Sequence, residues 1–286
     1  MEAGSEGWLF AVALGTSALG GMLGMASGIF IVPVLVLFGG IDLYHAIAAS
    51  IVSVIACSCG SAAPFLRSRL TNLRLAVVLE VATTLGALTG VFLVGILPIS
   101  YLYLLFTAVL LVSAQQMLTR RREQVAALAD RPQGSWADRL RLHSTHPDPP
   151  TGREVAYRVQ RLPLGLLLMY GAGVISALLG IGSGVLKIPA MDTALRLPIK
   201  VSSATSNFMI GVTAAASGAA YFMRGDILPA IAAPVAVGSV VGSILGARIL
   251  LRVSNEHLRL FFVVILVALA VAMGLMAFDI QLYRSP

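Results

Sequence analysis

The sequence predicts an all-α integral membrane protein made of two homologous four-segment halves. Composition is the first observation behind this prediction, because hydrophobic residues make up 58% of the 286 residues, charged residues 12%, and the mean hydropathy is +0.90. Soluble domains carry about 25% charged residues, so this chain holds more apolar surface than one soluble core can bury. The other two observations are a glycine motif that occurs twice and the distribution of the arginines.

The glycine motif lies at residues 24–33 and again at residues 180–189, at an offset of 156 residues. Both copies read G-[MI]-[AG]-S-G, followed by four mostly apolar residues and a proline. The first copy lies inside the apolar stretch from Trp8 to Gly40, which as one helix would be about 50 Å long against a bilayer core of about 30 Å. A glycine-broken or re-entrant first segment resolves this length. Such breaks at corresponding positions of two halves are typical of a transporter binding site.

Three further apolar runs follow the broken segment in each half. In the first half they lie at about 43–66, 73–97 and 99–118. In the second half the broken segment at 162–195 is followed by runs at about 200–223, 227–251 and 257–278. The pattern Gly86-x-x-x-Gly90, whose small residues permit close helix packing, recurs as Gly242-x-x-x-Gly246 at the same offset. An internal duplication is therefore predicted, with a first repeat at 1–118, a linker at 119–161 and a second repeat at 162–286.

The linker is basic and rich in proline. It holds nine arginines against five acidic residues, together with four prolines. By the positive-inside rule such a segment is cytoplasmic, and we expect a solvated loop with a short interfacial helix around Trp136. The spacing His143-x-x-His146 lies in this proline-rich context, which favours a solvated loop over a metal site. No metal and no other cofactor is therefore expected.

The arginine distribution also predicts how the halves are oriented. If each broken segment is re-entrant, or makes two short crossings, each half crosses the membrane an odd number of times and the second half is inverted. The linker and most of the flanking lysines and arginines then lie on the cytoplasmic side, with both termini outside. Four full crossings per half would place five of these cations outside, so inverted repeats are favoured.

The helix that starts after each glycine cluster is a candidate anion site. Its first backbone N–H groups are unpaired, and its dipole places about +0.5 of an elementary charge at the N-terminus. Glycine lets the backbone approach a ligand closely, and one serine in each cluster adds a hydroxyl donor. The predicted binding residues of the clusters are Gly24, Ser27, Gly28, Gly180, Gly182, Ser183 and Gly184. The alternative is that these glycines only let helices pack closely or kink.

Two charged residues interrupt the apolar runs. A cation inside a membrane is costly, so Lys187 is a candidate for substrate binding, and snorkelling to the cytoplasmic interface is the alternative. Glu80 is a candidate coupling residue, as a proton-carrying carboxylate or an ion-pair partner for an arginine, unless it lies near the lipid headgroups. At the offset of 156 residues their counterparts are Ile31 and Ala236, so each charge is present in one half only.

Consecutive polar residues lie in the apolar run after the second break. Thr205, Ser206 and Asn207 are candidates for hydrogen bonds to sulfonate or carboxylate oxygens, and hydrogen bonding between helices is the alternative. Ser50 and Ser53 are their weaker counterparts in the first half.

At these residues the chain resembles the sulfite exporter TauE/SafE family, also called the toluene-sulfonate uptake permease family. The resemblance covers both halves and leaves out the linker. Residues 180–189 are similar to the family's second glycine break, and Ala204-Thr205-Ser206 is similar to the start of the helix that follows it. The first half departs from the pattern, with Ala26-Ser27 where the family often has two glycines. The resemblance implies a carrier of small sulfur-containing anions or organic acids.

We therefore expect a secondary transporter of small anions, of the sulfite or organosulfonate type, that works by alternating access in the cytoplasmic membrane. The alternatives are an anion channel and a membrane-embedded sulfur-handling partner protein. The sequence shows no nucleotide-binding loop and no catalytic-triad spacing, so we expect neither catalytic residues nor an enzyme. The expected partners are a small anionic substrate, the lipid bilayer and a coupled proton or ion, and nothing points to nucleic acid.

Overall fold

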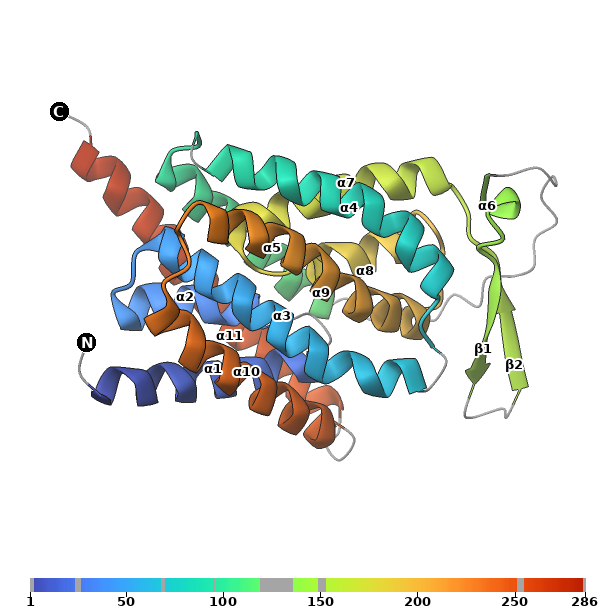
Figure 1. Ribbon diagram of the computed structural model, residues 1–286, viewed down its shortest axis with the longest axis horizontal. Helices are drawn as coiled ribbons and strands as arrows, with labels where there is room; N and C mark the ends of the chain where they lie inside the picture. The colour runs from blue at the N-terminus through green and yellow to red at the C-terminus, as the bar shows by residue number, and fades with distance from the viewer. Residues whose placement is uncertain are drawn as a thin grey trace.

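A computed structural model describes residues 3–23, 27–67, 70–94, 96–118, 136–148, 153–250 and 255–284. The helices of the first half are α1 (Ala3–Leu23), α2 (Gly28–Gly39), α3 (Leu43–Arg67), α4 (Leu73–Val94) and α5 (Ile99–Leu118). Those of the second half are α7 (Leu162–Leu179), α8 (Gly184–Thr193), α9 (Ile199–Met223), α10 (Pro229–Leu250) and α11 (Asn255–Arg284). Between them lie α6 (Trp136–Arg139), β1 (Ser144–Asp148) and β2 (Arg153–Tyr157). Figure 1 shows the helices bundled together, with the two strands at one end of the bundle.

The two halves repeat each other helix by helix. The starts of α2 and α8, of α3 and α9, of α4 and α10, and of α5 and α11 are all separated by the 156 residues that separate the two glycine motifs. The glycine cluster divides the first apolar segment of each half into two helices, α1 and α2 or α7 and α8. The prediction of an all-α protein with a broken first segment in each half is therefore confirmed.

Glycines with positive φ determine the break in the second half. Gly180 caps the C-terminus of α7 with a φ of +65°, and Gly182 follows with a φ of +72°. L side chains rarely adopt this left-handed conformation, so glycine ends α7 at little energetic cost. The chain then turns into α8, which starts at Gly184. In the first half α2 starts at Gly28, while Gly24 lies outside the described residues.

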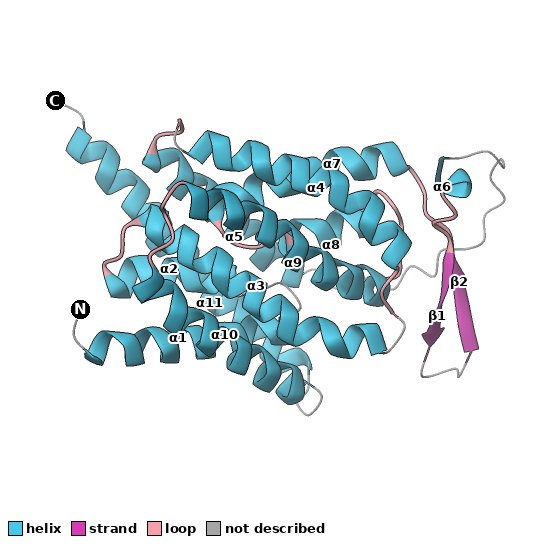
Figure 2. Cartoon of the chain, viewed as in Figure 1, coloured by secondary structure: helices cyan, strands magenta, loops and turns pink. Residues whose placement is uncertain are grey.

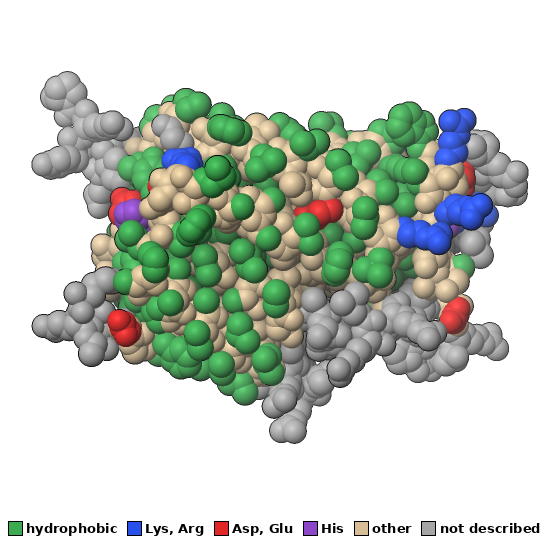
Figure 3. All heavy atoms as spheres, in the orientation of Figure 1, with side chains coloured by type: hydrophobic (Ala, Val, Ile, Leu, Met, Phe, Trp, Pro, Cys, Tyr) green, Lys and Arg blue, Asp and Glu red, His purple; other side chains and the backbone are tan. Residues whose placement is uncertain are grey.

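The exposed surface suits lipid. Among the described residues, five helical stretches are long and apolar enough to cross a membrane: Leu43–Gly60, Leu73–Val94, Ile99–Gln116, Leu162–Leu179 and Pro229–Gly246. On α4, the large apolar residues exposed at helical spacing are Leu73, Val77, Val81, Leu85, Leu88 and Phe92. A stripe of this length suits lipid chains and would be a liability in water. Figure 3 shows apolar side chains over most of one face, with lysine and arginine gathered mainly at the end that carries the strands.

Glycines bring pairs of helices from opposite halves into backbone contact. A Cβ built at Gly86 of α4 would overlap the carbonyl oxygen of Tyr170 in α7. At the equivalent position of α10, a Cβ at Gly242 would overlap the carbonyl oxygen of Leu14 in α1. Such close approach is what small residues permit between membrane helices. The close packing predicted from the two glycine patterns is therefore confirmed, and each pattern packs against the other half.

The helix directions support an inverted repeat. Gly86 and Gly90 of α4 face Tyr170 and Val174 of α7 in turn, so these two helices run in the same direction. In Figure 1 the start of α1 and the end of α11 lie at one end of the molecule, and the strands lie at the other. This is the arrangement that the arginine distribution predicts. The inversion itself and its orientation in a membrane stay predictions.

The segment between the halves differs from the predicted solvated loop. β1 and β2 pair antiparallel, with Ser144 opposite Tyr157, and Figure 2 shows them as a hairpin of strands beside the helices. The linker residues buried in one apolar cluster with α4, α8 and α9 are Ala137, Leu142, Tyr157 and Val159. The prediction of a solvated loop is wrong for these residues, because their apolar side chains pack against the helices. The predicted short helix around Trp136 is present as α6, with the indole exposed.

A buried asparagine ties this hairpin to the helices. The side-chain nitrogen of Asn72, just before α4, donates to the carbonyl oxygen of Leu142 at 3.0 Å and to the Tyr157 hydroxyl at 2.9 Å. Its backbone N–H donates to the hydroxyl of Thr205 on α9 at 3.2 Å. Burial raises the pKa of Tyr157 above its ordinary value, so this phenol stays neutral at physiological pH.

Candidate functional site

The two glycine breaks touch each other. A Cβ built at Gly28, the first residue of α2, would overlap the carbonyl oxygen of Gly180 and lie 2.7 Å from the carbonyl carbon of Ile181. Ser50 of α3 donates a hydrogen bond to the same Gly180 oxygen at 2.7 Å. The N-terminus of α2 therefore lies against the turn that leads into α8. The breaks bring together elements that lie 152 residues apart, from Gly28 to Gly180, and both partners are predicted site residues.

The second break carries a donor without a partner. Ser183 is the N-cap residue of α8, its side chain is 1% exposed, and its hydroxyl has no hydrogen-bond partner. The first N–H groups of a helix also lack partners within the helix. Lys187 lies four residues further along, on the same face of α8, and is fully buried. The start of α8 therefore presents donors and a cation on one face.

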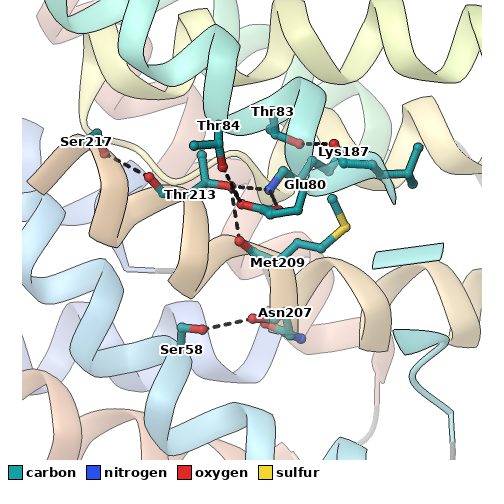
Figure 4. A network of polar contacts seen from close by, with 10 residues as sticks. Ser58, Glu80, Thr83, Thr84, Lys187, Asn207, Met209, Thr213 and Ser217 are labelled. Carbon is teal, nitrogen blue, oxygen red and sulfur yellow. Dashed lines mark hydrogen bonds and ion pairs between the residues drawn. The ribbon is translucent and has the colours of Figure 1, made fainter. Parts of the chain in front are cut away.

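Figure 4 shows Lys187 at the centre of a buried polar network with Glu80 of α4 and Thr213 of α9. The Lys187 Nζ donates to the Thr213 hydroxyl at 2.6 Å and to Glu80 Oε2 at 3.3 Å. The Thr213 hydroxyl in turn donates to Glu80 Oε1, and Thr84 donates to the same oxygen at 3.4 Å. A buried ion pair with such additional hydrogen bonds avoids an uncompensated charge.

These contacts decide between the alternatives for the two charged residues. Snorkelling of Lys187 is excluded, because its side chain is 0% exposed and its ammonium group is bonded by two other helices. Glu80 is 9% exposed and bonded to the same ammonium, so it does form an ion pair, although its partner is a lysine and not the expected arginine. The sequence suggested each residue separately, and the structure joins them across 107 positions.

Two of the three consecutive polar residues on α9 also have unpartnered donors. Ser206 and Asn207 are 0% and 3% exposed, and neither the Ser206 hydroxyl nor the Asn207 side-chain nitrogen has a hydrogen-bond partner. Thr205 differs, because its hydroxyl accepts the N–H of Asn72 and so takes part in a contact between helices. Buried polar atoms normally have partners, so the unpaired donors on α8 and α9 are open to a ligand that accepts hydrogen bonds.

At the first break, the serine hydroxyls are hydrogen-bonded to one another. The hydroxyls of Ser27 and Ser53 are hydrogen-bonded at 2.6 Å, and Ser53 is bonded to Ser239 of α10 at the same distance. Ser17 of α1 lies 3.4 Å from Ser53, and all four side chains are fully buried. The predicted donor Ser27 is therefore occupied within the protein, whereas its counterpart Ser183 is free.

Sequence reasoning missed the residues that connect the predicted ones. Thr213 lies seven residues after Ser206 and shares its face of α9, and this spacing of polar residues in an apolar run was the available signal. Ser53 was expected as a weak counterpart of the polar residues on α9, whereas Ser239 gave no comparable signal, because isolated serines are common in membrane helices. Gly182 and Gly184 shape the turn into α8, while their role in binding stays a prediction.

Comparison with known proteins gives the family. The family model for the sulfite exporter TauE/SafE matches residues 9–273. The chain is also 21% identical over 267 residues to the "Probable membrane transporter protein YunE" of Bacillus subtilis (strain 168), covering 91% of this chain and 93% of that one. No solved structure matches. Together with the apolar helices, these findings describe a multi-pass membrane transporter, and the chain belongs to the sulfite exporter TauE/SafE family.

Proposed function

We propose that this transporter moves small anions of the sulfite or organosulfonate type across the cytoplasmic membrane, and that it holds the anion at the second glycine break. The observation that carries the proposal is the set of buried groups there: the ammonium of Lys187 with the unpartnered donors of Ser183, Ser206 and Asn207. All of them lie on α8 and α9, two helices that pack against each other.

The sign of the groups favours an anion. An ammonium, an amide nitrogen and the N-terminus of a helix all attract negative charge. The oxygens of sulfite or a sulfonate accept several hydrogen bonds at once, so one such group can satisfy donors from two helices. A cation would instead need oxygen ligands, and the carboxylate that contacts Lys187, that of Glu80, is already paired with the lysine.

The placement of the breaks supports the proposal of alternating access. In transporters with inverted repeats, the binding site lies where the broken helices of the two halves meet, and access alternates as one half moves against the other. Here Gly28 and the Gly180–Ile181 turn are in direct contact. Because this contact joins the halves, motion between them would change the surroundings of Ser183 and the start of α8.

The test begins with thermal unfolding of the purified protein in the presence of sulfite, sulfate, thiosulfate, sulfoacetate, taurine and simple carboxylates. A ligand that binds the native state raises the unfolding temperature. Asn207→Asp decides the sign of the ligand, because it keeps the size of the side chain and replaces the donor with a negative acceptor. We expect the variant to lose the rise in unfolding temperature that the anion gives in the wild-type protein. The proposal would be overturned if no anion stabilised the wild-type protein and Na⁺ stabilised the variant more than the wild type.

Transport distinguishes a carrier from a channel. In proteoliposomes, a carrier that works by alternating access takes up labelled substrate against its gradient when the same anion is loaded inside. A channel shows no such counterflow. We therefore expect counterflow of whichever anion gives the largest thermal shift, and downhill flux without counterflow would replace the carrier with an anion channel.

A further inference from the structure

Glu80 holds the ammonium group that the proposed substrate needs. Its Oε2 accepts from Lys187 Nζ at 3.3 Å, and its Oε1 accepts from Thr213 and Thr84. The carboxylate therefore acts as an internal counter-anion that neutralises the lysine of the empty site. An incoming anion has to compete with it for the same ammonium.

We propose that Glu80 carries a proton together with the substrate. When an anion takes over Lys187, Glu80 releases the ammonium and takes up one proton, so that one anion and one proton occupy the site together. This inference rests on the proposed function, because it requires an anion at Lys187. It goes beyond that function by naming the coupling ion, the residue that carries it and the stoichiometry.

Charge balance is the physical reason. The empty site holds one buried cation and one buried anion. A second anion beside the same ammonium would leave a net negative charge in a low-dielectric interior, with two like charges close together. Protonation of Glu80 removes this repulsion, since the site then holds Lys187, a neutral acid and the substrate. One added proton and one monovalent anion, such as methanesulfonate, together bring no net charge into the membrane interior.

No other charged group in the described part of the neighbouring helices replaces Glu80 in this role. α7 contributes Tyr170, whose hydroxyl bonds Thr89 at the exposed surface. Arg224 caps the far end of α9. Asp192 lies five residues beyond Lys187, which places it on a different face of α8. The ion pair that responds to a substrate is therefore that of Glu80 and Lys187.

The hydroxyl of Thr213 is placed to follow the proton. In the empty site it accepts a hydrogen bond from Lys187 and has two acceptors of its own, Glu80 and, at 3.1 Å, the carbonyl oxygen of Met209. When Glu80 gains a proton, its new O–H donates to Thr213, and the hydrogen of Thr213 turns to Met209. One O–H bond forms on the carboxyl group as one O–H bond of a hydronium ion breaks, which leaves water, and no other covalent bond changes.

Proton uptake predicts how affinity depends on pH. The empty site holds ionised Glu80 and the occupied site holds protonated Glu80, so binding takes up a proton and strengthens as pH falls. By linkage, one proton per anion lowers the affinity about tenfold for each unit of rising pH. The probes are methanesulfonate and sulfoacetate, which exchange no proton of their own between about pH 6 and about pH 8. Binding to the wild-type protein is measured by calorimetry in two buffers of different ionisation enthalpy, which also counts the protons taken up.

Glu80→Gln identifies the titrating group. The amide resembles the protonated acid, so we expect the affinity to become independent of pH and to equal or exceed that of wild type at the acidic end of the range. Glu154→Gln is the matched control, because Glu154 is an exposed carboxylate on β2 that bonds only the hydroxyl of Thr145 among the described residues. It should keep the tenfold dependence.

Lys187→Arg excludes the lysine as the titrating group, because a guanidinium stays charged throughout this range. The dependence on pH should persist in any binding that this variant retains. Wild-type binding without proton uptake, or an unchanged pH dependence in Glu80→Gln, would overturn the inference and leave the anion site intact. Failure of both probes to bind at any pH would overturn the proposed function and this inference with it.

Discussion

The two glycine breaks share a backbone plan and differ in side-chain chemistry. At the first break the hydroxyl of Ser27 is bonded to Ser53, which is bonded in turn to Ser239. At the second break Ser183 has no partner, because the position equivalent to Ser53 is Met209, which cannot donate to it. The serine hydroxyl at this turn is therefore hydrogen-bonded within the protein in the first half and unpaired in the second half.

The charged network follows the same division. The second break has Glu80, Lys187 and Thr213 around the start of α8, and the equivalent positions around α2 hold Ala236, Ile31 and Cys57. Duplication thus supplied two helix N-termini in contact with each other. The side chains at a few positions then diverged, so that the N-terminus of α2 is bonded within the protein and that of α8 keeps unpaired donors. We therefore expect one anion site although the two backbones are equivalent.

The largest effect is expected from breaking the ion pair. Lys187→Met leaves the buried carboxylate of Glu80 uncompensated, which destabilises a protein by about 3–5 kcal/mol, and anion binding should be lost. Adding Glu80→Gln should restore most of the stability and none of the binding. The control is Ile31→Met at the equivalent position, which should cost less than about 1.5 kcal/mol. Unfolding in detergent measures all three, and equal effects of the two methionine variants would contradict the pair.

Equivalent substitutions at the helix-packing glycines of the two halves should destabilise the protein to a similar extent, unlike equivalent substitutions at the proposed anion site. Gly86→Ala and Gly242→Ala each force a methyl group against a backbone carbonyl of the opposite half, at Tyr170 and Leu14. We expect each to destabilise the fold by about 1–3 kcal/mol, and to a similar extent. Thermal unfolding of the two variants is the measurement. A large loss in one and none in the other would show that only one of the two helix pairs is closely packed.

Alanine substitutions of the two N-cap serines should affect different properties, the stability of the protein at Ser27 and its affinity for the anion at Ser183. Ser27→Ala leaves the hydroxyl of Ser53 with one partner fewer and should cost about 1 kcal/mol of stability with little change in anion affinity. Ser183→Ala removes no internal bond, so stability should hold while affinity falls about fivefold. Unfolding and anion titration of both variants make the comparison. Identical behaviour of the pair would mean that both serines serve packing.

The smallest effect concerns the hairpin, whose Tyr157 is buried in an apolar cluster with residues of α4, α7, α8 and α9. Tyr157→Phe removes the hydroxyl that accepts from Asn72 and keeps the buried ring. Asn72 retains its bond to Leu142, so we expect a loss of about 1 kcal/mol or less. The change in unfolding temperature is the measurement, with Tyr170→Phe as the control at an exposed hydroxyl. A larger loss in the control than in Tyr157→Phe would count against anchoring of the hairpin by Asn72.

The class of the protein could be predicted from the sequence because it depends on properties that follow chain order. Apolar runs, their lengths and the offset of 156 residues are visible without coordinates, and they predict membrane helices, a duplication and a broken segment in each half. Residues that are costly in lipid also stand out one by one, which is how Glu80, Lys187 and Asn207 became candidates. Their roles are a different matter, since polarity alone does not say what each side chain faces.

Packing between distant segments decided the rest. The sequence treats Ser27 and Ser183 as equal, because the residues that close one and leave the other open lie on other helices. The pairing of Glu80 with Lys187 and the burial of Tyr157 likewise arise only when helices from opposite halves come together. Local pattern fixes which segments enter the membrane, whereas the hydrogen-bond partners of a buried side chain depend on which helix faces it across the bundle.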